Sequence, residues 1–180
     1  MPKRGRFSRL GFAAASMLVC AIVVACFFPQ LVGTYWHLRH GNSIEFHEWT
    51  IPVPRGWWPQ TDGSQLVIQK MTWNYDRNDS TVIEVLTMNY SQPVHIDALK
   101  KAVLNQMSRD GYAFRGDRDV DIGSSPGYCA KFVNDTRHRN IHIACWSLKN
   151  HLSLDLLGYA RDVQTFYSVI DQIKPSKAQR

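Results

Sequence analysis

The sequence lacks the short motifs that mark the most common enzyme sites. It has no phosphate-binding loop of the G-x-x-x-x-G-K-[ST] type, no G-x-G-x-x-G turn, no H-E-x-x-H zinc motif and no spaced set of Cys and His ligands. The C-x-x-C pair of redox-active helices is also missing. Residues 123–127 (GSSPG) match the G-x-S-x-G pattern of hydrolases. We expect a strand rather than a helix after Ser125, however, and interpret this stretch as a turn.

The remaining candidates for a metal site lack a complete set of ligands. His37 and His40 are three residues apart and His47 is nearby, but no acid or Cys completes the group. The alternating acids of residues 117–121 are interleaved with arginine, which favours a solvated strand face over a calcium site. We therefore predict no metal, no cofactor and no catalytic residues, and a protein that is not an enzyme.

Acidic residues are absent from the first 33 residues, and charge of either sign is absent from residues 11–33. A bilayer core about 30 Å thick needs about 20 apolar residues in a helix, which residues 11–33 supply. Residues 1–10 form a tail with only basic charges, which we expect in the cytoplasm: Lys3, Arg4, Arg6 and Arg9. The pattern predicts a single-pass signal anchor in the inner (cytoplasmic) membrane, with the C-terminal domain in the periplasm or outside.

The net charge of +6 belongs mostly to this tail. Four of the 21 Lys and Arg lie in it, which leaves 17 against all 15 acids and a charge of +2 for the rest of the chain. Nucleic-acid binding needs a basic stripe in the folded domain, and the sequence gives no sign of one. We therefore expect a membrane and an envelope protein as partners, and no nucleic acid.

Two kinds of anchor remain open. Residues 23–26 (VVAC) resemble the lipobox of bacterial lipoproteins, in which Cys26 would become the lipidated N-terminus. Against this, the sequence FFP follows instead of a polar tether, and the apolar run continues to Val32. We favour the uncleaved anchor, kinked at Pro29, because these residues bring the span to full length. A third outcome, cleavage and release, lacks an obvious small-x-small site.

The outer part of the chain divides into a linker, one domain and a tail. Residues 34–43 are interpreted as an interfacial linker, in which Tyr35 and Trp36 suit the headgroup region with Arg39 beside them. The next segment, 44–175, is long enough for one domain with its own core. A flexible tail is predicted at the end, 176–180.

Hydrophobic patterning predicts eight strands and two helices in this domain. The helices are expected at 96–109 and 162–173, where apolar residues recur at helical spacing, with Asp97 capping the first and Gly111 closing it. The order predicts an α+β domain, with an antiparallel β-sheet flanked by two helices and preceded by the transmembrane helix. Strands are expected at 43–54 in two pieces, 65–73, 80–89, 112–122, 128–133, 140–148 and 152–156, with a hairpin turn at 74–78.

Two of the four cysteines lie in the outer domain. If the turn between their strands centres on Arg137, the numbers of paired residues sum to 274, which places Cys129 opposite Cys145. Opposed Cβ atoms in a non-hydrogen-bonded pair are about 4.5–5.5 Å apart, near what a disulfide tolerates. Because an exported domain meets an oxidising compartment, we favour a disulfide over two buried thiols.

Trp57 and Trp58 follow a proline-rich turn. Such a pair can form a stacking platform for a ligand, but more often it covers the open end of a sheet. We favour the second interpretation and keep the pair as a weak candidate for ligand or partner binding.

These features resemble the PsbP-like domain family, which includes a photosystem accessory protein and assorted bacterial envelope proteins. The resemblance rests on the stretch 50–57 (TIPVPRGW), the helix at 96–109 and the closing helix at 162–173, and it covers residues 44–175. It implies the α+β fold and a non-catalytic binding or assembly module, without fixed active-site residues. The long membrane segment departs from the soluble members of the family.

The sequence therefore predicts a membrane-tethered, non-enzymatic binding or scaffolding domain of the cell envelope. One alternative is an envelope hydrolase or ligand-processing enzyme with a pocket near Trp57 and Trp58. Another is a subunit of a secretion or assembly machine.

Overall fold

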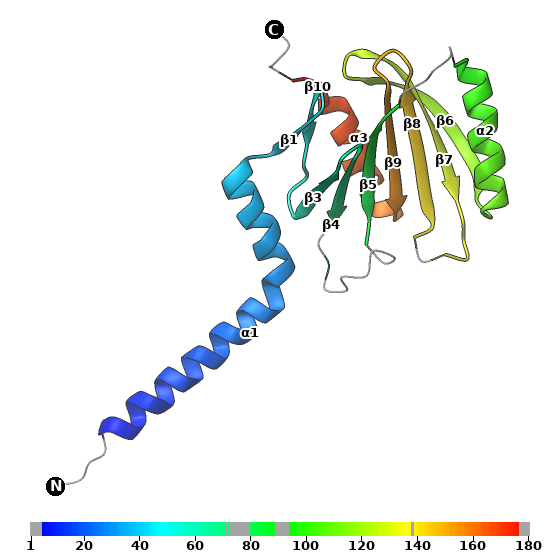
Figure 1. Ribbon diagram of the computed structural model, residues 1–180. Helices are drawn as coiled ribbons and strands as arrows, with labels where there is room; N and C mark the ends of the chain where they lie inside the picture. The colour runs from blue at the N-terminus through cyan, green and yellow to red at the C-terminus, as the bar shows by residue number, and fades with distance from the viewer. Residues whose placement is uncertain (1–4, 71, 73–79, 89–93, 138, 177–180) are drawn as a thin grey trace.

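The computed structural model describes residues 5–70, 72, 80–88, 94–137 and 139–176, with side chains from residue 11. One long helix, α1 (Gly5–His40), leads into a domain built on two antiparallel sheets (Figure 1). The small sheet contains β1 (Ser43–Phe46), β2 (Trp49–Pro52) and β10 (Lys174–Pro175). The large sheet contains β3 (Trp57–Asp62), β4 (Gln65–Lys70), β5 (Val82–Thr87), β6 (Ala113–Ile122), β7 (Ser125–Val133), β8 (Ile141–Ser147) and β9 (Leu152–Gly158).

The large sheet has the strand order β3-β4-β5-β9-β8-β7-β6, and every neighbouring pair is antiparallel. The hairpin predicted from 65–73 and 80–89 is confirmed, because β4 pairs with β5 and Ile68 faces Ile83. Its predicted turn at 74–78 lies outside the described residues. The predicted α+β class with an antiparallel sheet and two helices is confirmed.

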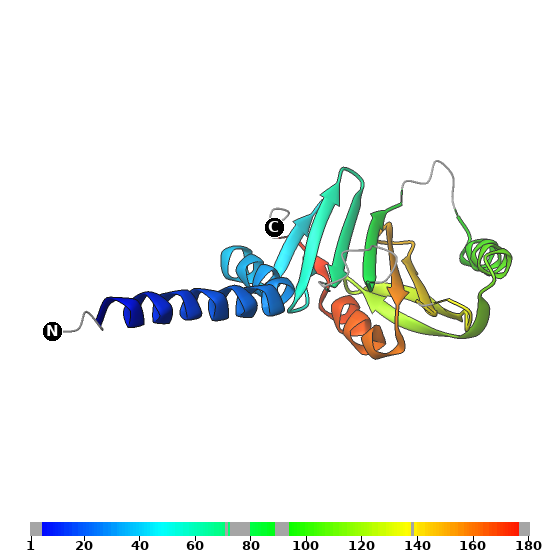
Figure 2. The same cartoon turned by 90° about the horizontal axis from the view of Figure 1, so that it is seen from below.

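The two helices of the domain cover opposite faces of this sheet (Figure 2). On one face lies α3 (Val163–Gln172), which follows the short 3-10 helix Ala160–Asp162 and buries Phe166, Val169 and Ile170. On the other lies α2 (Ile96–Arg109), whose bounds agree with the prediction. His95 rather than Asp97 occupies the N-cap of α2, while Gly111 follows its C-terminus at a φ of 80° that favours glycine.

The face under α3, together with the small sheet, forms the main hydrophobic core. Alternate residues of the central strands point into it, as strand geometry requires, and the fully buried members include Leu66, Ile68, Ile83, Val85, Leu154 and Leu156. The carboxylate of Asp162 lies at the edge of this core, where it pairs with Lys70 Nζ at 2.6 Å and accepts a hydrogen bond from Thr81. These contacts tie the start of α3 to the large sheet.

The helix α1 continues through most of the stretch predicted as a linker. It reaches His40, where Gly41 and Asn42 turn the chain into β1. The physical reason is docking: Gly33 closely approaches Gly56, and Trp36 packs in the core of the domain. Trp36 is only 7% exposed, so it is part of the protein core rather than a headgroup anchor.

The strand β3 was not predicted, because Trp57 and Trp58 were expected in a turn. Both tryptophans begin this strand, which pairs with β4 at the edge of the large sheet. Pro59 also lies in β3, and a proline is tolerated there because one side of an edge strand needs no ladder hydrogen bond. Adjacent bulky rings and a proline hide the alternation on which the strand prediction depended.

A candidate binding groove between α2 and the sheet

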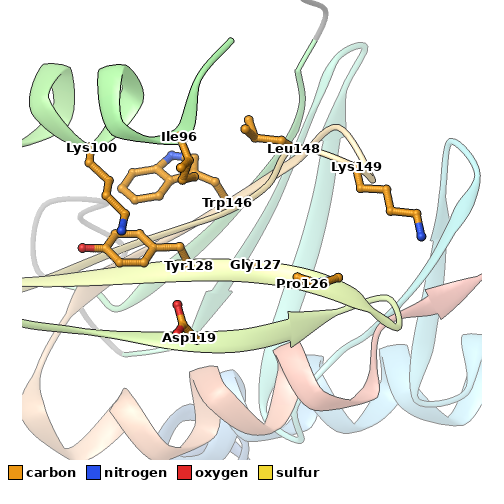
Figure 3. A pocket seen from close by; sticks show the side chains of 9 residues that line it. All are labelled: Ile96, Lys100, Asp119, Pro126, Gly127, Tyr128, Trp146, Leu148 and Lys149. Atoms are coloured by element: carbon orange, nitrogen blue, oxygen red, sulfur yellow. The ribbon is translucent and has the colours of Figure 1, made fainter. Parts of the chain in front are cut away.

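A groove of about 410 Å³ opens between the start of α2 and the strands beneath it (Figure 3). Its lining combines apolar, aromatic and charged side chains from four elements and one turn. The residues are Ile96 and Lys100 of α2, Asp119 of β6, Pro126, Gly127 and Tyr128 of β7, Trp146 of β8, and Leu148 and Lys149 of the following turn.

The floor of the groove is a stacked aromatic pair. Tyr128 and Trp146 face each other across β7 and β8, with ring centroids 5.8 Å apart and planes inclined by 15°. Both residues are less than a tenth exposed, so neighbouring strands fix their rings. A rigid, flat apolar surface of this kind binds well because it loses little conformational freedom when a ligand covers it.

Two lysines stand at opposite ends of this floor. The ammonium of Lys100 lies 3.6 Å from the centroid of the Tyr128 ring and points toward it, whereas Lys149 points away from the aromatic pair (Figure 3). A cation held over an aromatic face keeps donors available for an anionic group. Asp119, the acid of the lining, comes from β6 directly opposite Tyr128.

The hydroxyl of Tyr128 is anchored below the groove by a hydrogen bond that it donates to the carboxylate of Asp117. Burial of the phenol raises the pKa of Tyr128 above its ordinary value, and the hydrogen bond and negative charge of Asp117 act in the same direction. The ring is therefore neutral over the physiological range, and its orientation is fixed by its own acceptor.

The groove exists because α2 packs on the surface of the sheet without being buried by it. All fourteen residues of α2, each of which the structure describes, keep part of their surface exposed. Its apolar stripe rests on a second, smaller cluster around Phe132 and Tyr112; the stripe consists of Ile96, Leu99, Val103 and Met107. A helix held by one narrow stripe leaves space along its flank.

The residues predicted as site candidates lie elsewhere. Trp57 is 3% exposed and belongs to the main core, and Trp58 packs against that core from the opposite side of β3. Among the described residues, neither the groove under α2 nor a more polar groove on the far side of β6 is lined by this pair. The weak binding role assigned to this pair stays a prediction.

The predicted disulfide is present. Cys129 and Cys145 are opposite each other in β7 and β8 with an S–S distance of 2.00 Å, and the same register pairs Val133 with Ile141. Both cysteines point into the main core, away from the groove. Cys26, the possible lipidation site, lies on an exposed part of α1.

Sequence reasoning missed the groove, although one signal was available. The sum of 274 that paired the cysteines also pairs Tyr128 with Trp146, which are their immediate neighbours. Nothing comparable connects Lys100 to these strands, because the position of α2 depends on tertiary packing.

A hydrolase site would need a nucleophile activated by a neighbouring histidine. The turn is shorter than the expected 123–127: Gly123 and Ser124 form it, and Ser125 is already the buried first residue of β7, so a strand and not a helix follows. On the strands under α2, Asp155 lies between its two partners: His142 Nε2 is 2.9 Å from one carboxylate oxygen and Ser153 Oγ is 3.3 Å from the other. That order differs from the Ser-His-Asp order of a catalytic triad.

No family model matches this chain, and no curated protein is similar to it in sequence. Among solved structures, the chain is similar to the solution structure of cyanobacterial PsbP (CyanoP) from Synechocystis sp. PCC 6803. The TM-score is 0.48 and the sequence identity is 11%, over 74% of this chain and 91% of that one. That solved structure is a PsbP protein, the family that the sequence resembles, and the similarity is one of chain arrangement at low sequence identity.

Proposed function

We propose that this protein is a membrane-tethered, non-enzymatic binding domain of the cell envelope, which holds an acidic segment of a partner protein in the groove under α2. The observation that carries the proposal is the groove itself, with its stacked Tyr128 and Trp146 floor and its flanking Lys100 and Lys149. Aromatic residues in partly enclosed pockets often contribute most of the binding free energy between two proteins.

The chemistry of the groove selects the class of partner. Its floor accepts an apolar or aromatic side chain, while the two lysines favour carboxylates beside that side chain. Because the groove is open rather than closed, a segment of a larger protein can lie along it. We therefore infer an acidic stretch with one large apolar residue, presented by an envelope protein.

Tethering follows from α1. Its described part includes one helix, Gly11–His40, that is long and apolar enough to cross a membrane by length and composition, a test that a signal sequence also passes. The basic tail before it supports an orientation with the domain outside the cytoplasm. The disulfide Cys129–Cys145 supports the same side, because such bonds persist in oxidising compartments. The mass of the mature chain distinguishes an uncleaved anchor from lipidation at Cys26.

Photo-crosslinking in the membrane tests the proposed groove. A photoreactive amino acid replaces Leu148, which lines the groove, or Leu104, an exposed residue of α2 outside it, in the full-length chain. We expect a crosslink to an envelope protein from position 148 only, through a peptide rich in Asp and Glu. The double variant Lys100→Glu/Lys149→Glu should reduce this crosslink about tenfold or more, as the loss of two charge-assisted contacts implies.

The control is Lys101→Glu, which reverses one charge at an exposed position of α2 next to Lys100. It should leave the crosslink unchanged. Crosslinking at position 148 that survives the double charge reversal, or that joins a peptide without acids, would contradict the proposed function.

A further inference from the structure

We propose that the part of α1 after Pro29 lies along the membrane surface, with an exposed apolar stripe of Leu31, Tyr35 and Leu38 inserted among the lipids. This inference rests on the proposed membrane anchor and adds a second membrane contact to it. The second contact fixes how the domain, and with it the groove, is oriented above the bilayer.

The shape of α1 provides the first step. The helix bends sharply in its last third, so that its last turns run across the direction of the first part (Figures 1 and 2). Pro29 lies inside the helix, where it removes one backbone hydrogen bond and its ring displaces the preceding turn. The residues from Gly11 to Phe28 already rise about 27 Å at about 1.5 Å per residue, close to the thickness of a bilayer core. The turns after Pro29 are therefore not needed to cross it.

One side of these last turns is docked on the domain. A Cβ atom on Gly33 would lie only 2.9 Å from the Cα atom of Gly56, so this close backbone approach requires glycine. Trp36 is buried in the core, and His37 Nε2 lies 3.0 Å from the carbonyl oxygen of Pro54. The helix and the domain therefore meet through fixed contacts rather than through a flexible tether.

The opposite side of the same turns is apolar and exposed. Leu31 is 47% exposed, Tyr35 57% and Leu38 83%, and their i, i+4, i+7 spacing aligns them in one stripe. At about 3.6 residues per turn this stripe points away from Gly33 and Trp36, and therefore away from the domain. Because these three apolar side chains follow directly after the membrane span, the surface of the bilayer is in reach and can cover them.

The polar groups beside the stripe match the headgroup region. Arg39 Nη1 donates a hydrogen bond of 2.8 Å to the hydroxyl of Tyr35, so a cation and a phenol are held together at the edge of the stripe. Tyrosine and arginine are residues that settle at the membrane–water interface, where the guanidinium meets lipid phosphates. The same contact would hold if Cys26 were lipidated, because the stripe follows that residue.

Spin labels at three leucine positions test this arrangement. The full-length chain, with Cys20→Ser and Cys26→Ser, carries Leu18→Cys, Leu38→Cys or Leu104→Cys and is reconstituted in phosphatidylcholine–phosphatidylglycerol vesicles. Collisions of each label with oxygen, which concentrates in lipid, and with a water-soluble nickel complex are measured by electron paramagnetic resonance. Leu18 represents the span, Leu38 the stripe and Leu104 the exposed side of α2.

We expect the label at position 38 to collide with the nickel complex several-fold less often than the label at 104, and to collide with oxygen more often. Its depth in the bilayer should be shallower than that of the label at position 18. If position 18 is protected by lipid while position 38 behaves like 104, the surface contact is wrong and the membrane anchor stands. If position 18 is itself accessible to the nickel complex, both the anchor and this inference are overturned.

Discussion

The two faces of the large sheet are built from the same strands, yet they are covered differently. The face toward α3 is closed: Leu152, Leu154 and Leu156 of β9 are all fully buried in the main core. The face toward α2 is partly open, and the alternate β9 residues there include Ser153 and Asp155. The strand period of two thus gives one sequence two different surfaces.

Because of this difference, the face that stabilises the fold is separate from the face on which binding is proposed. The closed face buries large aliphatic side chains, which is where most of the folding free energy arises. The open face keeps polar groups and a helix with no fully buried residue among those described, so it can be changed at smaller cost. The groove proposed for binding lies on that face and does not compete with the core.

The largest expected effect on stability comes from comparing two adjacent leucines of β9 that point to opposite faces of the sheet. Leu156→Ala should lower the free energy of unfolding by about 2–5 kcal/mol, because Leu156 is fully buried between Ile83 and Ile143. Leu157→Ala, under α2 and only partly buried, should cost about 1 kcal/mol. Denaturant unfolding of the full-length chain in detergent, followed by tryptophan fluorescence, measures both; equal losses would show that the faces contribute alike.

Prediction from the sequence was strongest where the fold depends on neighbours along the chain. Strand alternation and hairpin symmetry gave the β7–β8 register to the residue, and helical spacing gave the bounds of α2. Both features arise from local periodicity, which a sequence displays directly.

Prediction was weakest where distant segments meet. The docking of α1 depends on Gly33 approaching Gly56, and a glycine in an apolar run carries no sign of its partner. The groove likewise depends on where α2 rests, so Lys100 and Lys149 could not be connected to Tyr128 in advance. The strand β3 was hidden because Pro59 and two adjacent tryptophans interrupt the usual alternation.

The disulfide tests how far the closed face supports the open one. Its cysteines point into the core, while their neighbours Tyr128 and Trp146 form the floor of the groove. Replacing both cysteines by Ala should destabilise the domain by about 3 kcal/mol, the chain-entropy value for a loop of this size. The ladder between β7 and β8 should still hold the aromatic pair, because hydrogen bonds rather than the disulfide set its register.

Thermal unfolding gives the loss of stability, and near-ultraviolet circular dichroism at low temperature reports whether the aromatic pair keeps its fixed environment. The variant Cys20→Ser/Cys26→Ser is the control, since both residues lie on α1 outside the domain, and it should leave both signals unchanged. Loss of the aromatic signal in the folded double Ala variant would show that the two faces are not independent.

The smallest effect concerns the proton of Tyr128, the one buried phenol of the groove floor. Burial and Asp117 raise its pKa, so the folded state keeps this proton at a pH where the unfolded chain, with an ordinary tyrosine pKa of about 10, loses it. Above about pH 10 the folded state therefore binds more protons than the unfolded state, and stability must fall as pH rises. Tyr128→Phe should lack this part of the alkaline loss, whereas Tyr35→Phe, which removes the hydroxyl of an exposed tyrosine on α1, should retain it. Unfolding curves at successive alkaline pH values measure the slope. Equal slopes for Tyr128→Phe and the parent chain would mean that the groove floor is as open to water as the rest of the α2 face. The description of Tyr128 and Trp146 as a rigid pair shielded from water would then be wrong.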